Sequence, residues 1–238
     1  MGIFDFFLSE DRRIAKEQRT LTNRDKQTED REAAARWLAD REAPKALVAL
    51  LTRFDMNLEN QLKDKSEKEL VYALLIGVGE PVVRPLERHL ARCKQVATPL
   101  RLYIDLVGLD AAIEKVFEIL RIEHEKDDFK PQKKHDLLIW LVDHQHERCI
   151  EVATPFLEDF DENVRYAAAE VMIAQRDDAA HPILERALAN PSEESNRLRV
   201  RLSEAFQQRR WIVSDRDAVA AVLPETFALT DDGRIIAA

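Results

Sequence analysis

The chain has 238 residues, enough for one extended domain or two compact ones. Acidic residues outnumber basic ones by 45 to 36, and the resulting net charge of −9 disfavours a whole-protein electrostatic affinity for nucleic acid or anionic membranes. Only 5 glycines stand beside 29 alanines and 28 leucines, a composition that favours helices over tight β-turns. We therefore expect an all-α protein in which any binding to polyanions is local.

The N-terminus combines an apolar segment with a charged one. Residues 1–8 hold the apolar cluster Ile3, Phe4, Phe6, Phe7 and Leu8. An exposed cluster of this kind usually binds something, and three fates stay open: folding back on the chain, docking into a partner, or contact with a membrane surface. In residues 9–27 the only apolar side chains are Ile14, Ala15 and Leu21. This composition predicts a loosely attached helix from Ser9 followed by a linker.

Residues 28–223 show short amphipathic segments whose apolar positions recur at i, i+3, i+4 and i+7, the pattern of one helix face. Each segment is too short to be stable alone, so neighbouring helices must bury one another. The breaks between segments divide the region into about six helix pairs: 28–58, 62–94, 96–126, 130–160, 161–190 and 191–223.

Two of these pairs repeat one another. The stretch Arg31-Glu-Ala-Ala-Ala-Arg-Trp-Leu-Ala aligns with Arg165-Tyr-Ala-Ala-Ala-Glu-Val-Met-Ile, and each is followed by a second helix that begins near a proline. The segment Asp161-Glu-Asn-Val-Arg-Tyr-Ala-Ala-Ala resembles the signature of HEAT repeats. The resemblance implies an α-solenoid whose second helices line a concave surface, with Asp161 and Arg165 in contacts between repeats. The family name predicts a shape and leaves the activity open.

The C-terminal residues 224–238 leave the helical pattern. Phe227-Ala-Leu and Arg234-Ile-Ile flank Asp231-Asp-Gly, and Gly233 can supply the positive φ of a tight turn. We predict a short β-hairpin that caps the last helix pair.

The sequence predicts no catalytic residue, metal ligand or cofactor site. Asp143-His-Gln-His-Glu-Arg-Cys149 collects residue types that bind zinc, but its spacing is that of a polar turn between two helices. Cys93 and Cys149 form no closely spaced pair, which suits a reducing compartment, and we expect a cytoplasmic protein. Among 238 residues no run approaches 18 apolar positions, so no membrane-spanning helix is predicted.

A basic stretch near the C-terminus is the second candidate contact region. Arg197, Arg201, Arg209 and Arg210, together with Trp211, lie in a stretch that holds few acids. Arginine suits bidentate contact with carboxylates, so these residues can either pair within the protein or bind an acidic partner. We expect a non-catalytic scaffold or adaptor whose partner is another protein, and nucleic acid is not expected as one. Two alternatives stay open: an enzyme similar to the HEAT-like DNA alkylation-repair glycosylases or bilin lyases, and a peripheral membrane adaptor anchored by residues 3–8.

Overall fold

The computed structural model describes residues 3–126 and 131–238, with side chains from Glu10 onward. The chain forms two compact units, Met1–Ile119 and Leu120–Ala238. The first unit contains α1 (Ile3–Leu21), α2 (Thr28–Ala39), α3 (Pro44–Leu51), α4 (Gln61–Val78), α5 (Val83–Leu90), α6 (Ala97–Val107) and the first part of α7 (Leu109–Glu125). The second contains α8 (Pro131–Val142), α9 (Cys149–Ala153), α10 (Glu162–Gln175), α11 (His181–Leu188), α12 (Asn196–Arg209), α13 (Arg216–Val222) and the strands β1 (Phe227–Leu229) and β2 (Ile235–Ala237).

The predicted all-α architecture with helix pairs and a hairpin cap is confirmed. Short 3₁₀ turns adjoin four of the second helices: η1 (Thr52–Asp55), η2 (Glu80–Val82), η3 (Thr154–Glu158) and η4 (Asp178–Ala180). Local sequence signals account for where first helices begin, because the side chains of Asn60, Asp161 and Ser195 accept hydrogen bonds from backbone N–H groups of α4, α10 and α12. Pro44 and Pro182 lie in the first turns of α3 and α11, where no intrahelical N–H partner is lost.

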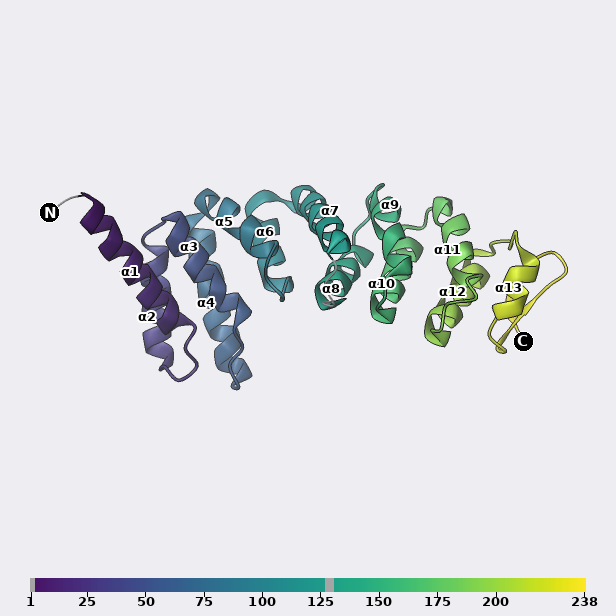
Figure 1. The fold of residues 1–238 in the computed structure, drawn as a ribbon, viewed down its shortest axis with the longest axis horizontal. Helices are drawn as coiled ribbons and strands as arrows, with labels where there is room; N and C mark the ends of the chain where they lie inside the picture. Colours follow the sequence, from purple (N-terminus) through teal and green to yellow (C-terminus); the bar gives the residue numbers. More distant parts are fainter. Residues whose placement is uncertain (1–2, 127–130) are drawn as a thin grey trace. The chain divides into compact units, whose positions relative to one another are not determined.

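In the first unit, helices of the same kind stack in rows. The first helices α2, α4 and α6 contact one another in succession, as do the second helices α3 and α5 (Figure 1). The helix α1 lies beside both α2 and α3. Their shared core includes Leu38, Leu47, Leu75 and Leu86, each fully buried. Burial of these side chains stabilises helices that would be marginal in isolation.

The prediction of a loose helix from Ser9 followed by a linker is wrong in two respects. The helix α1 begins at Ile3, and it runs across the predicted boundary between residues 8 and 9. Ile14 and Leu21 are buried, and α1 packs on α2 and α3. The few apolar residues of this segment all fall on or near one face, so a narrow stripe suffices when two helices already offer a matching surface.

A buried ion-pair network connects three elements of the first unit. Glu67 on α4 accepts hydrogen bonds from Arg31 on α2 and from Arg53 on η1, with N–O distances between 2.6 and 3.2 Å. Arg53 is fully buried and also donates to Asp64 (2.9 Å) and to the carbonyl of Met56 (3.0 Å). Burial opposes ionisation of Glu67, but the hydrogen bond from Arg31 and the charges of both arginines outweigh it, and its pKa lies below the ordinary value.

In the second unit α10 lies between α8 and α12 (Figure 1). Its buried face is rich in small side chains, with Ala167, Ala168 and Ala169 fully buried beside Val171 and Met172. Small residues let helix axes approach closely, which explains why this segment carries the Ala-rich repeat signature.

The C-terminal hairpin closes the second unit. Strands β1 and β2 pair antiparallel, with Ala228 opposite Ile236. Gly233 has φ +81° in the turn and donates to the carbonyl of Thr230 (2.9 Å). Buried Ile235 belongs to β2, which contacts α12, while β1 contacts α13. The hairpin therefore covers the apolar surface that the last helix pair would otherwise expose.

Candidate functional site

Arg31 and Arg165, which align in the sequence, occupy equivalent positions in their units. Arg31 donates two hydrogen bonds to Glu67, and its third nitrogen contacts the carbonyls of Asn23 and Lys26 in the preceding loop. Arg165 likewise donates to Glu193 at 2.8 and 2.7 Å, and its remaining nitrogen contacts two carbonyls of the loop before α10. Each arginine thus joins one helix pair to the next.

Asp161 caps its own helix. Its carboxylate accepts hydrogen bonds from the backbone N–H groups of Asn163 and Val164, so it caps α10. Glu193 is the acid that pairs with Arg165. Burial opposes its ionisation, but the hydrogen bonds from Arg165 and from the backbone of Ser195 lower its pKa below the ordinary value.

The basic stretch on α12 lies mainly against α10. The guanidinium of Arg197 stacks over the ring of Tyr166, with 3.8 Å from Cζ to the ring centroid. Arg201 forms a bidentate pair with Glu170 at 2.5 and 3.1 Å. Arg209 donates to the carbonyl of Ile173 at 2.8 Å. These three arginines therefore join neighbouring helix pairs.

The remaining two residues of that stretch differ from each other. Trp211 is buried, and its indole N–H donates to Asp178 at 2.9 Å. Arg210 ends α12 in the left-handed conformation, with φ 56°. Its side chain is exposed and makes no hydrogen bond or ion pair with any residue that the structure describes. The predicted patch is thus largely a packing surface within the second unit.

The structure also shows where the remaining candidate residues from the sequence lie. The cluster from Asp143 to Arg148 is the polar turn between α8 and α9. Cys149 begins α9 with no exposed surface, and burial raises the pKa of its thiol to about 11. Ile3, Phe4, Phe6, Phe7 and Leu8 belong to α1, but their side chains lie outside the described residues.

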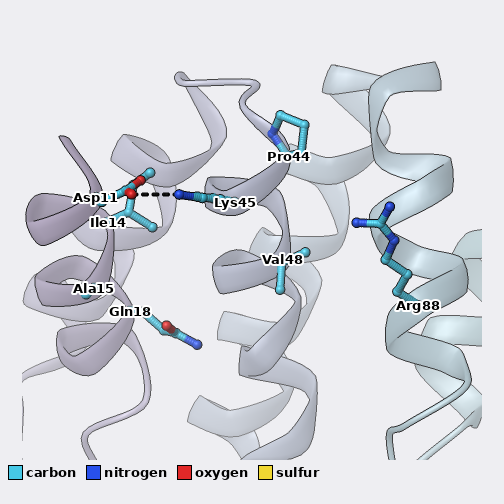
Figure 2. A pocket seen from close by; sticks show the side chains of 8 residues that line it. All are labelled: Asp11, Ile14, Ala15, Gln18, Pro44, Lys45, Val48 and Arg88. Carbon is cyan, nitrogen blue, oxygen red and sulfur yellow. Dashed lines mark hydrogen bonds and ion pairs between the residues drawn. The ribbon is translucent and has the colours of Figure 1, made fainter. Parts of the chain in front are cut away.

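A groove of about 380 Å³ lies on the first unit between α1, α3 and α5. Figure 2 shows its lining: Ile14 and Ala15 come from α1, Pro44 and Val48 from α3, and Arg88 from α5. At one end Lys45 pairs with Asp11 at 2.6 Å, which neutralises the charge of that lysine. The groove is therefore apolar along its floor, with a single arginine on the α5 wall.

The sequence analysis missed the arginines of α5. Arg84 and Arg88 are one turn apart on this helix, and Arg92 lies two residues beyond its end. All three side chains are exposed, and none makes a hydrogen bond or an ion pair with another residue in the described ranges. We call these three residues the α5 arginine row. Its i, i+4, i+8 spacing was a visible signal, although Arg197 and Arg201 show the same spacing and are paired.

The described part of the chain contains neither a membrane-spanning helix nor a metal-binding cluster. No helix there is long and apolar enough to cross a membrane. Residues 10–126 and 131–238 also contain no cluster of three or more histidine, cysteine or acidic side chains placed to hold a metal ion.

Comparison with known families gives one match. Residues 164–190, which comprise most of α10, the turn η4 and α11, match the family described as PBS lyase HEAT-like repeat. No curated protein matches the sequence significantly. The segment with the strongest internal repeat signature is thus a HEAT-like repeat, as its residues predicted.

Proposed function

We propose that this chain is a non-catalytic helical-repeat protein that binds another protein on the second helices of its first unit. One observation carries the proposal. The charges of α10 and α12 that face neighbouring repeats are paired, as in Arg165 with Glu193 and Arg201 with Glu170, whereas the α5 arginine row beside the apolar groove has no partner among the described residues.

The groove has the properties of a docking site for a helix or peptide. Its floor offers Ala15 and Val48 for apolar contact, and Val48 is 39% exposed. Helix-in-groove recognition uses such a floor for affinity and the charged rim for orientation. We further propose that the protein works in the cytoplasm, where its two free cysteines would remain reduced.

Blocking the groove tests this proposal. Ala15→Trp places a large side chain in the groove, and Ala33→Trp makes the same change at an exposed position of α2 as a control. Each tagged full-length protein is incubated with nuclease-treated native lysate, and captured proteins are quantified by mass spectrometry. We expect an abundant partner that wild type and Ala33→Trp retain and Ala15→Trp loses. Equal capture by all three proteins contradicts binding in the groove.

Deleting residues 1–8 in the same experiment tests the N-terminal apolar cluster. Loss of the partner in the deletion would make this segment part of the binding surface. Retention of the partner, together with loss of binding to lipid vesicles, would assign the segment to a membrane surface instead.

A further inference from the structure

The α5 arginine row is not explained by the needs of the fold. Arg84 lies in the first turn of α5, where the helix dipole favours acids and disfavours cations. Arg84 and Arg88 are also like charges at i, i+4, an arrangement that destabilises a helix. The row therefore costs the free protein some stability, which is typical of residues kept for binding.

Two acids near the row are already engaged elsewhere. Glu87, the one acid of α5, accepts a hydrogen bond from Tyr103 at 2.9 Å and lies 3.7 Å from Lys115. Asp11, the acid that lines the groove, pairs with Lys45. The positive charge of the row is therefore left for a ligand from outside the chain.

The row and the groove meet at Arg88. Arg88 belongs to both, and Figure 2 shows its side chain on α5, with Val48 of α3 between it and Ala15 of α1 in this view. Successive arginines of the row on α5 are about 6 Å apart along the helix, since each residue rises about 1.5 Å. Carboxylates at i and i+4 of a ligand helix have the same spacing, and arginine binds carboxylates bidentately.

We infer that the groove binds an acidic amphipathic helix of another protein, with apolar side chains over Ala15 and Val48 and carboxylates at Arg84 and Arg88. This inference rests on the proposed function and adds the chemistry of the partner. The groove lining contains no aromatic residue on which a base could stack. The net charge of −9 also opposes approach of a polyanion. A short acidic segment with apolar anchors therefore fits this surface better than nucleic acid does.

The test uses a phage-displayed library of random peptides, so that no partner needs to be known. The full chain is screened as wild type, as the charge reversal Arg84→Glu/Arg88→Glu, and as the control Arg36→Glu/Arg186→Glu. The control arginines are exposed on α2 and α11 and do not line the groove, and their reversal changes the net charge equally. Wild-type circular dichroism and a cooperative melting transition at no lower temperature than that of wild type show that each variant is folded.

We expect wild type and control to enrich peptides that combine leucine or phenylalanine with several acids. The charge reversal should weaken synthetic copies of these peptides by at least about tenfold, since close charge pairs at interfaces are worth more than one decade in affinity. Enrichment of neutral or basic peptides, enrichment of none, or equal affinity for the charge reversal would overturn the inference. The inference would also be overturned if the protein bound single-stranded oligonucleotides or phosphatidylserine vesicles and the same reversal abolished that binding, because the row would then bind phosphate groups.

The two proposals fail in different ways. If Ala15→Trp abolishes capture from lysate but the charge reversal leaves it unchanged, the groove is a binding site and its partner is not acidic. If neither change affects capture, the groove is not the binding site and both proposals are wrong.

Discussion

Removing the carboxylate of Glu67 is expected to destabilise the first unit severely. Its side chain is 3% exposed and accepts four hydrogen bonds, two from Arg31 and two from Arg53. In Glu67→Ala, Arg53 keeps Asp64 and a carbonyl, whereas Arg31 keeps only neutral partners, two carbonyls of the preceding loop and the Thr28 hydroxyl. Leaving buried cations without their main acid costs about 3–5 kcal/mol.

The same helix supplies a matched control. Glu69 on α4 also pairs with an arginine, because both of its carboxylate oxygens accept from Nη2 of Arg101, but the two side chains are 50% and 51% exposed. Solvent screens such a pair, so Glu69→Ala should cost less than about 1 kcal/mol. The two variants therefore differ in burial while the residue type, the helix and the kind of partner stay the same.

Urea unfolding gives the total change in stability, and hydrogen exchange read by mass spectrometry locates it. Glu67→Ala should lower the unfolding midpoint and speed exchange in α2 and α4, while α10 and α12 keep their protection. Glu69→Ala should leave both readouts close to those of wild type. A free-energy cost for Glu67→Ala no greater than that for Glu69→Ala would refute the view that burial makes this network important.

Three further predictions concern pH, the hairpin turn and thiol reactivity. The folded-state pKa values of Glu67 and Glu193 are lowered, so their contribution to stability is full above the unfolded pKa of about 4.3 and is lost as pH falls through the folded values. When the free energy of unfolding is measured against pH, acid should therefore reduce it less in Glu67→Gln than in wild type. Equal reductions would contradict this prediction. Gly233→Ala forces a positive φ of 81° and brings its Cβ within 3.1 Å of Ile212 and of a backbone oxygen, which should cost about 1–2 kcal/mol. Gly77→Ala lies in the last turn of α4, where an added Cβ meets nothing within 4 Å apart from its own helix and chain neighbours, and it should instead stabilise the protein by up to about 1 kcal/mol. The two melting temperatures must therefore move in opposite directions. Because burial raises the pKa of Cys149 to about 11, iodoacetamide should label it at least about tenfold more slowly in the folded protein than in urea, and equal rates would show that the thiol is accessible.

The residues that align in the sequence explain why the architecture was predictable. Helix faces repeat every three to four residues, so each amphipathic segment reveals itself without knowledge of its neighbours. The alignment of Arg31 with Arg165 correctly paired two side chains with equivalent contacts. Gly233 marked the hairpin turn because few other residues adopt a positive φ there.

The contacts between repeats were not predictable in the same way. Asp161 was expected in contacts between repeats, but it caps its own helix, and the acid that pairs with Arg165 is 28 residues further along the chain. Likewise the sparse apolar residues of α1 gave no sign that α2 and α3 would bury Ile14 and Leu21. These outcomes depend on which surfaces meet after folding.

Two sets of arginines show most clearly what the sequence determines and what the tertiary structure determines. Arg197 and Arg201 have the same i, i+4 spacing as Arg84 and Arg88, and the sequence alone determined that each pair shares one face of a helix. Only the tertiary structure decided that α10 meets the first pair with Tyr166 and Glu170, while the second pair faces solvent beside an apolar groove. The physical reason is that helix periodicity is a local property of the backbone, whereas a charge is paired or free according to residues some 30 positions away that packing brings to it.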